Sequence, residues 1–95
     1  MKKPETRPWA PAKAELPDTV ALQALSNGTA DEHQQKRALK WIIEVSAGTY
    51  DQQFYPGDDG RRDTDFALGR RYVGLSIVKE LRLNVSELRR REENA

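Results

Sequence analysis

Few side chains in this sequence could perform catalysis or bind a metal ion. His33 is the only histidine and cysteine is absent, which leaves no histidine pair, catalytic triad or cysteine-ligated zinc site. Four aspartates lie in or after the turn at residues 56–60: Asp58, Asp59, Asp63 and Asp65. Their spacing lacks the Asp-x-Asp-x-Asp-Gly pattern of a calcium loop, and the turn lacks the lysine of a phosphate-binding loop. We therefore expect no catalytic residue, no metal site and no cofactor, and predict that the protein is not an enzyme.

Arginine supplies most of the positive charge in the last third of the chain. Eight arginines follow residue 60: Arg61, Arg62, Arg70, Arg71, Arg82, Arg89, Arg90 and Arg91. Contacts to phosphate or to an acidic partner are predicted for four of them, namely Arg71, Arg82, Arg89 and Arg90. The alternative is a solvated charged surface, because glutamates are interspersed and the formal net charge of the whole chain is only +1.

The distribution of proline predicts an arm followed by one domain. Four of the five prolines fall within the first seventeen residues: Pro4, Pro8, Pro11 and Pro17. Residues 1–17 are therefore expected to form an extended N-terminal arm, and residues 18–95 a single helical domain. Trp9 is the arm's large apolar residue and a candidate anchor on a protein surface. The alternative interpretation of the arm is a disordered tail.

The remaining sequence predicts an all-α fold, a small bundle of about three to four helices. Helices are expected over about 18–27, 30–47, 63–81 and 85–93. Their starts are predicted from capping residues, which are Asp18, Thr29 with Glu32, Asp63 or Thr64, and Asn84 with Glu87. Gly28 and Gly48 are expected to end the first two helices, since glycine readily adopts the left-handed conformation found there.

Apolar periodicity predicts which faces of the shorter helices are buried. In the helix over 30–47, the expected core stripe is Leu39, Ile42, Ile43 and Ser46, with Trp41 and Val45 beside it. In the last helix, Val85 and Leu88 are expected to point inward. In the intervening loop, the rings of Tyr50, Phe54 and Tyr55 are expected to cap the open end of the helix pair; a ligand-binding cup is the alternative.

The helix over 63–81 carries two apolar faces. At 100° per residue, its predicted core face lies within a sector of about 80° and comprises Phe66, Val73, Ile77 and Leu81. Leu68, Tyr72 and Leu75 lie nearly opposite, and Gly69 and Ser76 form a flat groove between the two faces. A second apolar face on a small domain favours association, so we predict a protein interface at Leu68, Gly69, Tyr72, Leu75 and Ser76, together with Trp9.

Two features interrupt the apolar pattern of this helix. Gly69 and Gly74 each cost about 0.5 to 1 kcal/mol relative to alanine in a helix interior, which predicts a close approach of another group at both positions. Arg70 falls within an apolar stripe, so its guanidinium is expected to extend outward or to pair with Asp63 or Asp65.

Residues 77–91 resemble a helix-turn-helix, with a regular first helix, a short turn and a basic second helix. The turn position that commonly holds glycine is occupied here by Arg82. Glu87 and the glutamates at the end of the second helix would face phosphate unfavourably. DNA binding is therefore the less favoured interpretation of this segment.

Residues 36–84 contain three groups of matching motifs. These are Arg37-Ala38-Leu39-Lys40-Trp41-Ile42-Ile43, Gly48-Thr49-Tyr50 with Phe54, and Phe66 through Leu75, which includes Gly69-Arg70-Arg71 and Val73-Gly74-Leu75. The segment resembles a family of short phage and prophage proteins encoded among the virion-assembly genes of short-tailed bacteriophages. The resemblance implies a phage structural or assembly context and no established catalytic activity.

The expected function is that of a non-enzymatic phage protein, a virion-structural or assembly component. It would dock or self-associate through the helix over 63–81 and the N-terminal arm, in the virion or the host cytoplasm. Its expected partners are other copies of itself or phage structural proteins, with nucleic acid less favoured and no membrane insertion. The alternatives are a small helix-turn-helix DNA-binding regulator and a phage-encoded inhibitor of a host protein.

Overall fold

A computed structural model describes residues 9–51, 57 and 60–94 of the protein. These residues form four α-helices and one π-helical segment, and none of them lies in a strand. The elements in chain order are α1 (Leu16–Asn27), α2 (Glu32–Lys40), η1 (Trp41–Ser46), α3 (Gly60–Arg82) and α4 (Val85–Glu93). The all-α prediction is confirmed. Residues 1–8 of the predicted arm lie outside the described residues, as do Phe54 and Tyr55.

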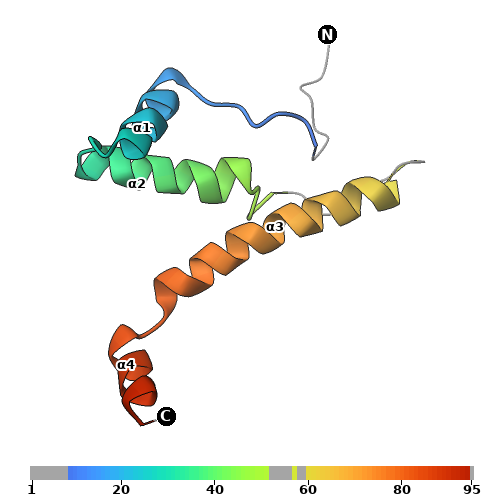
Figure 1. The fold of residues 1–95 in the computed structure, drawn as a ribbon. Helices are drawn as coiled ribbons and strands as arrows, with labels where there is room; N and C mark the ends of the chain where they lie inside the picture. The colour runs from blue at the N-terminus through green and yellow to red at the C-terminus, as the bar shows by residue number, and fades with distance from the viewer. Residues whose placement is uncertain (1–8, 52–56, 58–59, 95) are drawn as a thin grey trace.

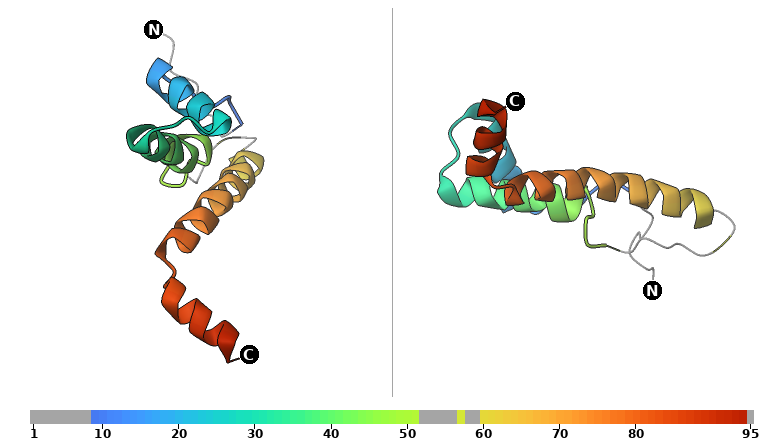
Figure 2. Two further views of the ribbon diagram at one scale, coloured as in Figure 1. Left: turned by 60° about the vertical axis from the view of Figure 1, so that its left-hand side comes forward. Right: turned by 90° about the horizontal axis from the view of Figure 1, so that it is seen from below.

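The helices form an open arrangement (Figure 1). Helices α1 and α2 lie side by side as a hairpin, α3 crosses the end of η1, and α4 turns away at the far end of α3. Figure 2 shows the same separation of α4 from the hairpin after rotation about the vertical axis. The radius of gyration is 17.2 Å, compared with roughly 12 Å for a compact domain of this length. Much of α3 and α4 therefore lies outside any shared core.

Helix α1 begins two residues earlier than the sequence indicated. Asp18 is the third residue of the helix and not its N-cap, and its carboxylate accepts a hydrogen bond from the backbone N–H of Glu15 at 3.0 Å. Pro17 fits in the first turn because an N–H there has no helical acceptor. At the other end, Gly28 has a φ of 74°, which confirms the predicted left-handed stop.

The predicted cap of the second helix was wrong. Asp31 and not Thr29 caps α2, and its carboxylate accepts from the backbone N–H of Gln34 at 2.8 Å. The side chain of Gln34 accepts from the backbone N–H of Asp31 in return, which completes the capping box. The backbone N–H of Thr29 instead donates to Ala24 at 2.9 Å and closes the end of α1.

The predicted helix over 30–47 changes its winding at Trp41. In η1 the backbone N–H of Ala47 donates to the carbonyl of Ile42, five residues earlier, at 2.9 Å. The buried apolar residues of α2, η1 and the C-cap of η1 are Ala38, Ile43 and Ala47, respectively. Leu39 is exposed, which contradicts its predicted place in the core stripe. A π-helical turn holds more residues than an α-turn, so an assignment of faces at 100° per residue fails across it.

Helix α3 begins at Gly60, three residues before the predicted start, so Asp63 and Thr64 lie inside the first turns. Its buried residues are Gly60, Asp63, Ala67 and Gly74. The predicted core face was wrong at three of its four residues, because Val73 and Leu81 are 54% and 59% exposed and Phe66 is also exposed. The fourth, Ile77, is half-buried. Small side chains let the helix approach η1 closely, which leaves the larger apolar residues on either side of the contact.

Helix α4 has the predicted bounds. Its cap is confirmed, since the side chain of Asn84 accepts from the backbone N–H of Glu87 at 3.0 Å. The inward orientation expected for Val85 and Leu88 was wrong, because both are exposed and no residue of α4 is buried. An ion pair of 3.3 Å joins Glu87 to Arg91 one turn later.

Candidate functional site

The candidate site is built on α3, and Gly74 determines how that helix is seated. A Cβ atom at Gly74 would overlap the hydroxyl of Thr49 and lie 3.1 Å from the Cβ of Ala47. The close approach predicted for Gly74 is therefore confirmed. Gly69 differs, because a Cβ there would meet no atom of the described residues within 4 Å. The contact predicted for Gly69 is therefore not made by the part of the chain that the structure describes.

Thr49 lies at the centre of the contact between α3 and the chain after η1. Its side chain is fully buried, and its hydroxyl donates to the carbonyl of Ile43 at 2.6 Å. Its own carbonyl accepts from Nε of Arg71 at 3.0 Å. Arg71 was predicted to contact phosphate or an acidic partner, and in this structure its half-buried guanidinium helps to fix α3 against this segment.

Arg70 lies beside Gly48 and pairs with a different acid from those predicted. Its guanidinium lies 3.8 Å from the carboxylate of Asp51, whereas the sequence predicted either an outward orientation or pairing with Asp63 or Asp65. Gly48 has a φ of 58°, and a Cβ there would come within 2.8 Å of Cζ of Arg70. The turn after η1 therefore needs glycine for its conformation and for the space that the guanidinium occupies.

The face of α3 that points away from this contact carries five of the predicted interface residues. We call this set the docking face; its members are Leu68, Gly69, Tyr72, Leu75 and Ser76. All five are exposed, and Tyr72 is 72% exposed. The hydroxyl of Ser76 donates to the carbonyl of Tyr72 at 2.8 Å, so its hydrogen bond is made within the helix. The docking face thus presents apolar and small groups together.

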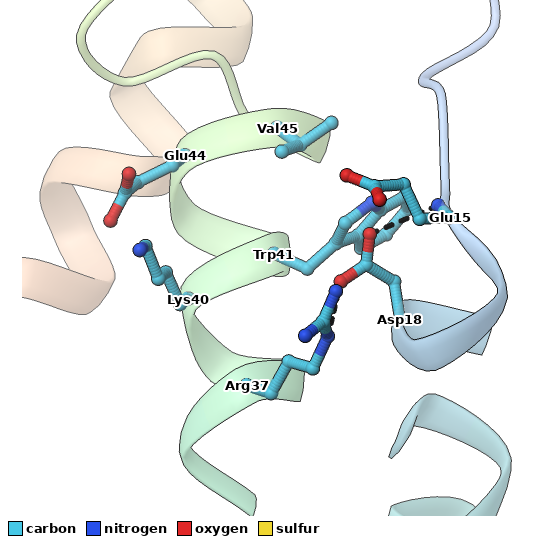
Figure 3. A pocket seen from close by; sticks show the side chains of 7 residues that line it. All are labelled: Glu15, Asp18, Arg37, Lys40, Trp41, Glu44 and Val45. Atoms are coloured by element: carbon cyan, nitrogen blue, oxygen red, sulfur yellow. Dashed lines mark hydrogen bonds and ion pairs between the residues drawn. The ribbon is translucent and has the colours of Figure 1, made fainter. Parts of the chain in front are cut away.

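A pocket at the start of α1 is a second feature of the surface, and it was not foreseen from the sequence (Figure 3). It has a volume of about 260 Å³ and is lined by Glu15, Asp18, Arg37, Lys40, Trp41, Glu44 and Val45. The indole N–H of Trp41 donates to the backbone carbonyl of Lys13 at 2.9 Å. A tryptophan in a polar helix was the signal available, since its ring needs both cover and an acceptor.

Two of the charged residues that line this pocket, Asp18 and Arg37, are paired with each other. Nε of Arg37 donates to the carboxylate of Asp18 at 2.7 Å, and the Asp18 side chain is only 14% exposed. The hydrogen bond from the backbone of Glu15 lowers the pKa of Asp18; burial opposes this shift, and Arg37 adds to it. These contacts fix α1 against α2, which favours a structural role for the pocket.

The other predicted site residues lie outside the docking face. Trp9 is half exposed ahead of α1. Arg82 ends α3, and Arg89 and Arg90 are exposed on α4. Arg90 lies 3.6 Å from Glu87, so part of its charge is balanced locally. The structure does not bring these arginines together with Arg71.

Neither a metal cluster nor a membrane helix is found among the described residues. Over residues 9–51, 57 and 60–94, no three acidic or histidine side chains are placed to hold a metal ion. No helix in the same part of the chain is both long and apolar enough to cross a membrane. No protein-family model matches the chain, and comparisons with curated proteins and with solved structures found no match either.

Proposed function

We propose that this chain is a non-enzymatic bacteriophage protein, a structural or assembly component that docks or self-associates through α3 and the N-terminal arm. The observation that carries the proposal is the docking face, whose large side chains are exposed on a long helix. The resemblance of residues 36–84 to phage assembly-region proteins supports the phage context. The proposed location is the virion or the host cytoplasm.

Exposed apolar residues on α3 support an interaction role. Burying one large apolar side chain contributes about 1.5 to 3 kcal/mol, and Leu68, Tyr72 and Leu75 together offer several such contributions to a partner. Residues of the other apolar flank, including Phe66 and Val73, are also exposed. Several large apolar side chains exposed on one helix are typical of an interaction site.

The first test is size-exclusion chromatography with light scattering of the wild type and of Tyr72→Glu, with and without a short DNA duplex. We expect a discrete wild-type oligomer, or a complex with a phage particle component. The charged variant should weaken either association at least tenfold while its helical circular dichroism stays unchanged. Glu92→Gln in α4 is the control for a change outside the docking face. Unchanged association of Tyr72→Glu would reject the docking face.

The arm has a separate test. Deletion of residues 1–15 should weaken association if Trp9 anchors the arm on a partner. Since this deletion also removes the acceptor of Trp41, the single substitution Trp9→Ala is the cleaner variant. Association that is unchanged in Trp9→Ala would reduce the arm to a tail.

DNA binding remains the second candidate because α3 and α4 are joined by a two-residue turn and expose Arg82, Arg89 and Arg90. This function predicts co-elution with the duplex and loss of binding at higher salt. Replacement of Arg89 and Arg90 by glutamine should then abolish the complex. An inhibitor of a host protein would instead give one stable complex in a pull-down from host lysate.

A further inference from the structure

We propose that the docking face is covered by a second copy of this chain, whose α3 lies antiparallel to the first about a two-fold axis at Tyr72. The inference rests on the proposed function, since it names the partner of the same face. It follows from the order of residues along the exposed side of α3 and from the spatial difference between Gly69 and Gly74.

The exposed side of α3 has a near-symmetric pattern about Tyr72. Leu68 and Ser76 lie four residues on either side, Gly69 and Leu75 lie three, and Asp65 and Lys79 lie seven. All are exposed, and at 100° per residue they occupy one sector of about 120° on the side away from η1. The face therefore has an apolar and small centre with one acid and one base at its two ends.

Charge selects the antiparallel orientation. A two-fold axis at Tyr72 places Asp65 of each helix beside Lys79 of the other, so two opposite-charge pairs form. A parallel pairing in the same register would place Asp65 beside Asp65 and Lys79 beside Lys79. Like charges across an interface disfavour an arrangement, so self-association through this face is expected to be antiparallel.

Side-chain size fits the same register. In the antiparallel pair Leu68 faces Leu75 of the second copy, and Gly69 faces Ser76 of the second copy. Small residues at these positions let two helices approach closely, while the leucines fill the space beside them. Two Tyr72 rings meet at the axis and can stack in an offset arrangement.

Gly69 is otherwise a costly choice of residue. Gly74 is required by Thr49 within the chain, whereas no atom of residues 9–51, 57 and 60–94 would lie within 4 Å of a Cβ at Gly69. Glycine in an exposed helix interior lowers helix stability relative to alanine. A second helix packed on the docking face would explain the glycine at position 69 in the way that Thr49 explains Gly74, because its atoms would leave no room for a Cβ.

The decisive experiment is a charge exchange monitored by sedimentation equilibrium. Asp65→Lys alone and Lys79→Asp alone should each raise the dimer Kd by about tenfold, because the two-fold axis makes the Asp65–Lys79 contact occur twice in every dimer. The double variant should return the Kd to near the wild-type value. Glu92→Lys in α4 makes the same change in net charge as Asp65→Lys and should leave the Kd unchanged. Circular dichroism of each variant confirms that the helices form.

Cross-linking tests the orientation, and the native absence of cysteine makes it specific. A mixture of Asp65→Cys chains and Lys79→Cys chains should be joined by a short bismaleimide into mixed pairs in preference to like pairs. Preferential like pairs would overturn the antiparallel arrangement.

The outcomes separate this inference from the proposed function. A monomer at all concentrations would overturn the second copy as the partner, while capture of a phage particle component that is lost in Tyr72→Glu would still support docking. A dimer that Tyr72→Glu dissociates but the double charge exchange does not restore would overturn the register and retain the face.

Discussion

The two halves of the described chain are stabilised in different ways. Residues 9–51 are tied together by contacts between segments distant in sequence, including the Asp18–Arg37 ion pair and the bond from Trp41 to Lys13. Residues 60–94 form a longer stretch of helix, yet only one face of α3 contacts the rest of the molecule, and α4 buries no residue.

This difference indicates a division of roles. A short isolated helix is marginal in water, and α4 has only its cap and local ion pairs to support it. Helix α3 is about 35 Å long at 1.5 Å per residue, which is longer than its contact with η1 requires. Under the proposed function, the first half would serve as a support from which the second half presents α3 to a partner.

The largest effect is expected where the two halves meet. Gly74→Leu would drive a side chain into Thr49, and overpacking of this kind typically costs about 1 to 3 kcal/mol. We expect a value near the upper end, because the backbone after η1 is fixed by Arg71. Chemical denaturation measures the change, and Gly69→Ala in the Tyr72→Glu background is the matched control. That control should gain about 0.5 to 1 kcal/mol, and an equal loss in both variants would contradict the contact at Gly74.

A smaller effect is expected within the first half. Trp41→Phe keeps a ring in the pocket but removes the N–H that donates to Lys13, at a cost of about 1 kcal/mol. Hydrogen exchange should increase at residues near the start of α1 and remain unchanged in α4. Equal changes in both regions would show that the halves unfold together.

Acid should weaken the first half specifically. The pKa of Asp18 lies below its ordinary value of 3.8 in the folded state, so the folded chain holds this proton less readily than the unfolded chain. Its contribution to stability is complete above about pH 3.8 and is lost as the pH falls through the lower folded-state pKa. Asp18→Asn should remove this part of the pH dependence. Denaturation midpoints between pH 2 and 5 would measure it, and an unchanged acid slope would contradict the assignment.

The smallest effect is expected in α4. Glu87→Gln removes its ion pairs with Arg90 and Arg91, which are exposed and together are worth a few tenths of a kcal/mol, about 0.3 to 0.5. The helicity of the variant should be slightly below that of the wild type at low salt. At high salt the two should become equal, because salt screens the ion pairs of the wild type. A loss of stability in residues 9–51 would indicate coupling that the structure does not show.

The sequence predicted helix ends correctly where only one or two turns of the chain determine them. Gly28 stops α1 and Asn84 caps α4, because both roles depend on backbone conformation and on hydrogen bonds within four residues. The cap of α2 was misassigned because Thr29 and Asp31 both precede suitable partners three residues later. The presence of the helices was thus predictable from the sequence. Their first residues were not, because they depend on which of two candidate caps forms its hydrogen bonds.

The sequence by itself determined an all-helical chain and a long helix with more apolar surface than a small domain can cover. Only the tertiary structure decided which side of α3 is buried. The close fit of Gly74 against Thr49, the binding of Arg71 to the Thr49 carbonyl and the pairing of Arg70 with Asp51 join residues about twenty positions apart. The periodicity of one helix contains no information about which distant segment packs against it. It therefore predicted the larger side chains to be buried, whereas small residues form the close contact in the structure.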